Sequence, residues 1–126
     1  MSVFRYVRLF TANDGTSHFE ELAASLEEQD FAPPAAPLLV GALGQATGSF
    51  LVVGGSGGWH GDVPHPTPRR QVFCVLEGRV RITVGDGASR EFAPGDLLLL
   101  EDTWGEGHVT RFLTDRMVVG ATALTS

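Results

Sequence analysis

Three polar side chains that could do chemistry lie an even number of positions apart in the middle of the chain: His65, Thr67 and Gln71. If this stretch is extended, they point to the same face, because side chains alternate along a strand. The interpretation assumes no bulge, and Pro66 and Pro68 make a bend plausible. Histidine exchanges a proton near neutral pH, so His65 is a candidate acid or base.

Arg69 shares the parity of Gln71, so of the adjacent pair Arg69 and Arg70 it is the one expected to face inward. A guanidinium there could clamp a carboxylate, phenolate or enolate, or stabilise developing negative charge. Arg69 is therefore a candidate catalytic residue. The alternative is a salt bridge from Arg69 to a carboxylate on a neighbouring strand, namely Asp96, Glu101 or Asp102.

Four aromatic residues are candidates for the wall of a ligand pocket. Phe73 has the parity of Gln71 and should line the same cavity. Trp59 and Trp104 stand beside glycines, where an aromatic gate is plausible. Phe50 is the fourth candidate, and for Phe50 and Phe73 ordinary core packing is the alternative.

Three further side chains are expected to have no role in chemistry. Cys74 should face away from Gln71 in mid-strand, as an inert buried residue and not as a nucleophile. His60 has the opposite parity to His65 and is expected at a rim or on the surface. His18 is expected to be structural or exposed.

Short apolar runs separated by turn residues predict an all-β sandwich or barrel. The segment from Ser17 to Glu28 stays open between a strand and a helix, since Phe19, Leu22 and Leu26 also form a helical stripe. The proline-rich segment 31–37 must be an extended connection. Strands are expected over 3–10, 48–54, 71–76, 79–84, 89–92, 97–100, 111–112 and 117–124.

Composition narrows the class of protein. The chain has 126 residues, 43% of them hydrophobic and 19% charged, which suits one packed domain. Its net charge is −6 and all nine basic residues are arginine, so nucleic-acid binding is not expected. No apolar run approaches the roughly 18 residues of a membrane span. With no export signal at the start and a single cysteine, we expect a cytoplasmic protein.

The stretch from Gly61 to His108 resembles the two sequence motifs of the cupin superfamily. The first motif consists of a glycine, a His-x-His, a glutamate and a second glycine. The places of its two histidines, its glutamate and its second glycine are occupied here by His65, Thr67, Gln71 and Gly78. The leading glycine is displaced to Gly61, and Trp59 holds its expected place.

The second motif centres on Pro-Gly-Asp and reaches a histidine after a strand. Here Pro94-Gly95-Asp96 leads through 97–100 to His108, and Phe112 stands where the motif has asparagine. The chain also resembles a bacterial subgroup of small single-domain cupins. The resemblance implies one domain over 1–126, with its motifs within 59–112.

The resemblance implies a double-stranded β-helix, or jelly-roll barrel, in which the strand from Gln71 neighbours the strand leading to His108. His65, Thr67, Gln71 and His108 would then converge in a pocket. Cupins use three histidines and a glutamate as metal ligands, and this sequence has Thr67 and Gln71 in two of those places.

Whether a metal binds is left open by this altered set. His65, Gln71 and His108 could hold one divalent ion (Zn, Fe, Mn or Ni), less tightly than a set with a carboxylate. A loop carboxylate could complete the set: Glu101, Asp102 or Glu106. No organic cofactor is expected.

The leading functional hypothesis is an enzyme that moves protons on a small enolisable molecule, by isomerisation, dehydration or cyclisation, possible steps in natural-product biosynthesis. His65 or His108 would be the base, and Arg69 or Gln71 would stabilise negative charge. Alternatives are a small-ligand binding or sensor module and a metal-dependent oxygenase. A homodimer is also expected, because the outward side chains Val72, Cys74 and Leu76 form an apolar strip that needs a cover, either from the chain itself or from a partner.

Overall fold

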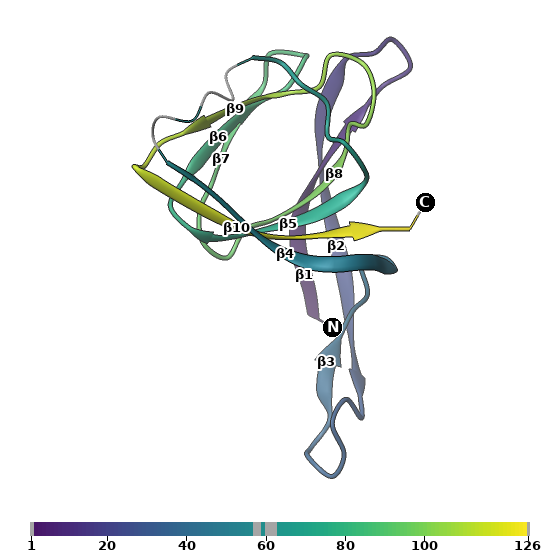
Figure 1. Cartoon of the computed structure of the whole chain (residues 1–126). Helices are drawn as coiled ribbons and strands as arrows, with labels where there is room; N and C mark the ends of the chain where they lie inside the picture. The colour runs from purple at the N-terminus through teal and green to yellow at the C-terminus, as the bar shows by residue number, and fades with distance from the viewer. Residues whose placement is uncertain (1, 57–58, 60–62, 126) are drawn as a thin grey trace.

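The computed structural model describes residues 2–56, 59 and 63–125, and every regular element in this part of the chain is a β-strand (Figure 1). The all-β prediction is confirmed. The strands are β1 (Ser2–Thr11), β2 (Ser17–Gln29), β3 (Leu38–Val40), β4 (Ala46–Ser56), β5 (Gln71–Glu77), β6 (Val80–Thr83), β7 (Ser89–Phe92), β8 (Leu97–Glu101), β9 (Val109–Phe112) and β10 (Arg116–Leu124).

Two sheets face each other. One has seven strands in the order β3-β2-β1-β8-β5-β10-β4, and the other has three in the order β7-β6-β9. Neither sheet closes on itself, so the arrangement is consistent with a β-sandwich. Strand β5 pairs antiparallel with β8, which confirms the predicted neighbourhood of the strand from Gln71 and the strand leading to His108.

The segment that the sequence left open is a strand. From Ser17 to Leu26 it pairs with β1, for example Phe19 with Leu9 and Leu22 with Tyr6. This ladder satisfies the backbone of both strands, which outweighs the helical spacing of the apolar residues. The short strand β3, which the sequence did not predict, pairs with the far end of β2.

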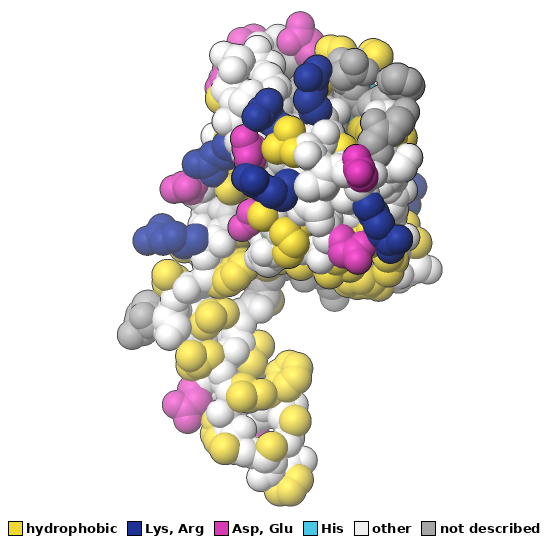
Figure 2. All heavy atoms as spheres, turned by 90° about the vertical axis from the view of Figure 1, so that its left-hand side faces the viewer, with side chains coloured by type: hydrophobic (Ala, Val, Ile, Leu, Met, Phe, Trp, Pro, Cys, Tyr) yellow, Lys and Arg dark blue, Asp and Glu magenta, His cyan; other side chains and the backbone are white. Residues whose placement is uncertain are grey.

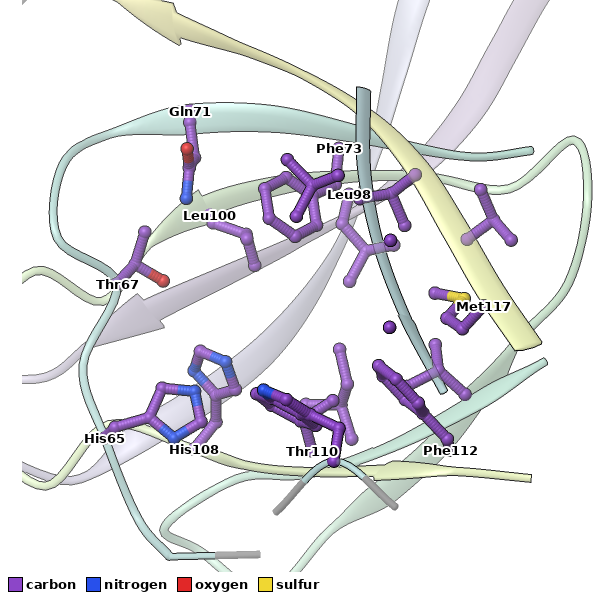
Figure 3. Close-up of a pocket in the computed structure, with 18 of the residues that line it drawn as sticks. His65, Thr67, Gln71, Phe73, Leu98, Leu100, His108, Thr110, Phe112 and Met117 are labelled. Atoms are coloured by element: carbon purple, nitrogen blue, oxygen red, sulfur yellow. The ribbon is translucent and has the colours of Figure 1, made fainter. Parts of the chain in front are cut away.

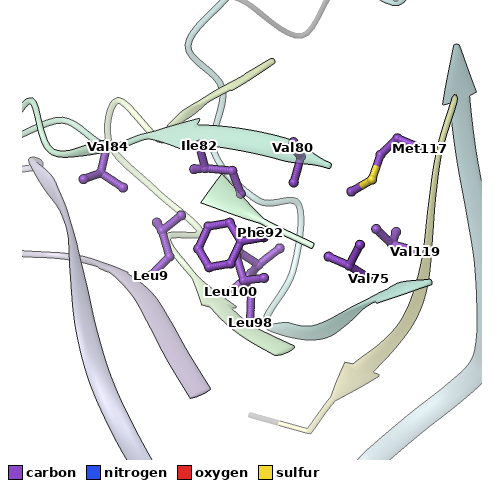
Figure 4. Close-up of a cluster of buried hydrophobic side chains, with 10 residues drawn as sticks. All are labelled: Leu9, Val75, Val80, Ile82, Val84, Phe92, Leu98, Leu100, Met117 and Val119. Atoms are coloured by element: carbon purple, nitrogen blue, oxygen red, sulfur yellow. The ribbon is translucent and has the colours of Figure 1, made fainter. Parts of the chain in front are cut away.

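The core lies between the two sheets (Figure 4). The large sheet contributes inward side chains from its central strands, such as Leu9, Leu98 and Val119. The small sheet contributes Ile82 and Phe92 from the opposite side. Burial of each such side chain stabilises the fold by about 1.5–3 kcal/mol. This core fills one part of the space between the sheets, and the remaining part is the pocket described below.

One end of the large sheet extends away from the body as a tail, residues 27–40 (Figure 1). Every residue from 27 to 39 is exposed, and Figure 2 shows hydrophobic side chains gathered on this projection. Phe31, Leu38 and Leu39 are among them. A second exposed apolar region lies on the outer face of β4 and β5, where Leu76 is 47% exposed. The homodimer stays a prediction.

No helix in the described part of the chain is long and apolar enough to span a bilayer.

Candidate functional site

A row of alternating prolines positions the first histidine. Pro64, Pro66 and Pro68 lack an N–H, so only His65 and Thr67 can donate from this extended stretch. The N–H of His65 donates to the carbonyl of His108, and the N–H of Thr67 donates to the carbonyl of Asp102, each at 3.0 Å. The segment is therefore tied on one side to the loop that carries the second histidine.

A glycine permits the close approach of these two segments. Gly107 has a φ of +75°, and a Cβ there would lie 2.1 Å from the backbone of His65. Its carbonyl accepts a hydrogen bond from the hydroxyl of Ser17, which is fully buried. Only glycine fits this position, and it brings His108 against His65.

The two histidines meet in the pocket (Figure 3). Their backbones form an isolated antiparallel bridge, with both N–H groups donating to the partner's carbonyl at 3.0 Å. Their ring centroids are 4.8 Å apart, with the planes at 55°. The predicted convergence of His65 and His108 is confirmed as geometry, and their chemical role stays a prediction.

Asp102 lies behind His108 and is completely buried. The Nδ1–H of His108 donates to one carboxylate oxygen at 2.5 Å, and the hydroxyl of Thr67 donates to the other at 2.6 Å. The carboxylate therefore fixes the proton of neutral His108 on Nδ1 and leaves the lone pair on Nε2.

A backbone carbonyl gives His65 the same tautomer. The carbonyl of Val63 can only accept, so the Nδ1 of His65, 2.8 Å away, must donate. Among the described residues, neither Nε2 has a hydrogen-bond partner. When both rings are neutral, the site therefore offers two lone pairs and no N–H donor from its histidines.

The pocket is a cavity of about 230 Å³ with a polar side and an apolar side. Figure 3 shows His65, His108, Thr67 and Gln71 toward one side, and Phe112 and Met117 toward the other. Trp59 is 47% exposed and stacks on Phe112 with ring centroids 4.9 Å apart. The described lining residues are mostly aromatic and aliphatic, which is usual for a small-molecule site.

Six of the site residues predicted from the sequence line this pocket. They are His65, Thr67, Gln71, Phe73, Trp59 and His108.

Arg69 does not line the pocket, so its predicted place there is wrong. A bend at Pro68 and Arg69 interrupts the alternation of side chains and leaves Arg69 exposed. Arg70 instead donates to Glu101, which also accepts from Arg8. Burial alone would raise the pKa of Glu101, but these two hydrogen bonds outweigh it and lower that pKa below its ordinary value.

The predicted pocket positions of Phe50 and Trp104 are also wrong. Phe50 is 68% exposed and packs on the outer face of the sheet, where a Cβ on Gly120 would lie 2.8 Å from its ring. Trp104 is in a turn, and its carbonyl accepts from the hydroxyl of Thr11. It therefore lies beside the β1–β2 turn and away from the pocket.

The residues expected to have no chemical role are placed as follows. Cys74 is half-buried and is not among the lining residues, as its parity predicted. His18 lies at the surface, where its Nδ1 pairs with Asp86 at 2.9 Å. His60 falls outside the described residues.

Sequence reasoning missed the role of Asp102, which it considered only as a metal ligand or a partner of Arg69. The signal was a carboxylate directly after the apolar strand β8, six residues before His108. It also missed Thr110, Phe112 and Met117 as lining residues. Each stands on a strand, β9 or β10, whose inward face the sequence did not resolve.

The donor set fits a metal ion only weakly. Histidines whose Nδ1–H groups are held by a carboxylate and a carbonyl are oriented as metal ligands are. Among the described residues, however, no group of three or more His, Cys, Asp or Glu side chains gathers at one point. Both oxygens of Asp102 already accept hydrogen bonds, so Gln71 is the remaining candidate ligand.

A scan against protein-family models found no family that matches this chain, and a search of curated proteins found no matching relative.

Proposed function

We propose that this protein is a small jelly-roll enzyme of the cupin type that moves a proton on an enolisable small molecule in the pocket between its sheets. The observation that carries the proposal is the buried pair of His108 and Asp102 at the polar side of an apolar cavity. A carboxylate behind a histidine orients the ring and stabilises the imidazolium that forms when the other nitrogen takes a proton.

The proposed step starts with neutral His108. Its Nε2 takes a proton from the carbon next to the substrate carbonyl, and the electrons of that C–H bond become the new C=C bond of an enolate. Where the substrate carries a C=C bond beyond that carbon, the enolate is conjugated with it. The imidazolium of His108 then returns the proton to the far carbon of that bond, which moves the C=C bond next to the carbonyl and completes an isomerisation. No oxidant or reductant is needed.

The enolate oxygen needs a hydrogen-bond donor. Arg69 cannot provide one, because it is exposed and outside the pocket. Gln71 lines the cavity and carries two amide N–H donors. A donor in a cavity that excludes water stabilises developing charge more strongly than it would in bulk water. Gln71 is therefore the proposed oxyanion donor.

A direct test is hydrogen–deuterium exchange of β-tetralone, a two-ring ketone with acidic α-protons, followed by NMR in deuterated buffer. The wild-type protein should accelerate exchange. His108→Asn keeps an N–H for Asp102 but removes the base, and it should lower kcat by about 10²–10⁴-fold with little change in ketone affinity.

His18→Asn is the matched control, because it removes a carboxylate-paired histidine at the surface. It should exchange β-tetralone at the wild-type rate. If the wild-type protein binds the ketone without accelerating its exchange, the pocket belongs to a binding module and the enzyme proposal fails.

A further inference from the structure

We infer that the ligand of this pocket is an uncharged, largely hydrocarbon molecule with a flat body of one or two rings and a single weakly acidic hydroxyl or enol as its polar head. The chemistry of the head rests on the proposed function. The charge and shape of the body rest on the pocket alone.

The charge of the ligand follows from the position of the arginines. The chain has nine basic residues, all arginine, and none of them lines the pocket. Arg5, Arg69 and Arg111 are exposed, and the other six pair with carboxylates outside the cavity. The seven residues that the structure does not describe contain no lysine or arginine. A buried phosphate or carboxylate would therefore lack a permanently charged partner, and it could pair with His65 or His108 only at the cost of protonating one of them in an apolar cavity.

The shape of the ligand follows from the size and walls of the cavity. Its volume of about 230 Å³ is below the range of about 300–1,000 Å³ for sites that hold drug-sized ligands. Phe73 and the stacked pair of Trp59 and Phe112 provide aromatic walls. Aromatic rings favour other flat rings in stacked or edge-on arrangements. A molecule of one or two rings suits this space.

The head of the ligand follows from the tautomers. Neutral His65 and His108 each hold their proton on Nδ1, toward Val63 and Asp102, so each can only accept at Nε2. A ligand group that also only accepts, such as the carbonyl of a ketone before it enolises, must turn toward the Gln71 amide and leaves both lone pairs without a hydrogen bond. A hydroxyl or enol donates, and its weak acidity matches a histidine base.

The test is a calorimetric comparison of four naphthalene probes that differ only in the head: 2-naphthol, naphthalene, 2-naphthoate and 2-naphthyl phosphate. We expect 2-naphthol to bind most tightly and naphthalene about two- to tenfold more weakly, the value of one hydrogen bond. The carboxylate and phosphate probes should bind at least 100-fold more weakly than 2-naphthol.

A variant with an added positive charge tests the role of charge in the pocket directly. Gln71→Arg places a cation in the cavity, so it should bind 2-naphthoate more tightly and 2-naphthol more weakly than the wild-type protein does. Trp104→Ala, outside the pocket, should leave all four affinities unchanged. Thermal unfolding of both variants checks that they are folded.

The inference is overturned if 2-naphthoate or 2-naphthyl phosphate binds wild-type protein as tightly as 2-naphthol does, or if none of the probes binds. These outcomes are separate from the failure of the proposed function. Selective binding of 2-naphthol without exchange of β-tetralone would remove the enzyme and keep the ligand class. Exchange of β-tetralone by a protein that prefers the anionic probes would keep the proposed enzyme and remove the inferred ligand class.

Discussion

The molecule contains two pairs of the same chemical kind in different surroundings. In each, the Nδ1 of a histidine meets an aspartate: His108 with Asp102 at 2.5 Å, and His18 with Asp86 at 2.9 Å. The side chains of the first pair are 7% and 0% exposed, and those of the second are 34% and 35% exposed. Solvent therefore reaches both side chains of the surface pair, whereas Asp102 of the buried pair is shielded from it.

The surroundings decide what each aspartate does. Asp86 closes a turn, and its pKa is lowered first by a hydrogen bond from the backbone N–H of Ala88 and then by His18. Asp102 has no turn to close, since its oxygens are divided between His108 and the hydroxyl of Thr67. We therefore expect a histidine–carboxylate pair to prepare a proton acceptor only where burial fixes the tautomer and a cavity admits a ligand.

Removal of the buried carboxylate should produce the largest difference between the pairs. Asp102→Ala leaves the Nδ1–H of His108 and the hydroxyl of Thr67 buried without an acceptor. The free energy of unfolding should fall by about 3–5 kcal/mol, as when one partner of a buried pair is removed. Asp86→Ala should change it little. Urea unfolding of both variants measures this, and equal losses would show that burial does not distinguish the pairs.

Substitutions at two glycines test whether the close approach of the His65 and His108 segments positions the site. Gly107 and Gly87 both have positive φ, but a Cβ would collide with His65 at the first and meet nothing within 4 Å at the second. Gly87→Ala should cost about 1–2 kcal/mol for its backbone conformation. Gly107→Ala should cost about 1–3 kcal/mol more, because it overpacks the contact between the histidine segments.

Thermal unfolding of the two glycine variants, with NMR shifts of the His65 ring, is the measurement. Equal costs and an unmoved His65 would mean that this close approach does not position the site.

Glu101, which precedes Asp102 in the sequence, gives a prediction about how stability depends on pH. Hydrogen bonds from Arg70 and Arg8 hold the pKa of Glu101 below its ordinary value, so Glu101 stabilises the fold at neutral pH and loses this effect as pH falls through the lowered pKa. Glu101→Gln should cost about 1.5–3 kcal/mol at pH 7.

Urea unfolding at a series of pH values measures this. The difference in the free energy of unfolding between wild-type and Glu101→Gln protein should narrow as the pH falls below about 4.5, the ordinary pKa of a glutamate. A gap that stays constant down to pH 2 would remove the electrostatic explanation. The surface pair is the control, because His18 and Asp86 both lie in solvent contact and His18→Asn should therefore alter acid stability far less than Glu101→Gln does.

A metal titration should show the smallest effect. If an ion binds, His65, His108 and Gln71 hold it, and Gln71→Glu should tighten binding because it supplies a negatively charged ligand. Isothermal titration with Zn²⁺ measures this, with His18→Asn as the control. Unchanged affinity in Gln71→Glu would place Gln71 against substrate rather than metal.

Much of the fold could be predicted from the sequence, because alternation fixes which face a residue takes within an uninterrupted strand. Eight of the strands were expected within two residues of their observed bounds, and Gln71 and Phe73 line the pocket as their parity required. The short strand β3 escaped, because three residues carry no periodicity and its pairing depends on the distant end of β2.

The alternation of side chains gave wrong predictions where the chain bends and where the sequence did not show which face of a strand is buried. The bend at Pro68 and Arg69 turned Arg69 to solvent. Phe50 lies on the outer face of β4, an edge strand whose residues are almost all exposed, so its hydrophobic character was misleading. The role of Asp102 depends on contacts across 35 positions to Thr67, which no local pattern carries.

Whether the buried pair makes His108 a base is tested by the exchange rate of β-tetralone with Asp102→Asn and Asp86→Asn, compared side by side with wild-type protein. We expect Asp102→Asn to lower kcat at least tenfold with KM nearly unchanged, and Asp86→Asn to exchange β-tetralone at the wild-type rate. Equal rates for all three proteins, or equal losses in the two variants, would contradict it.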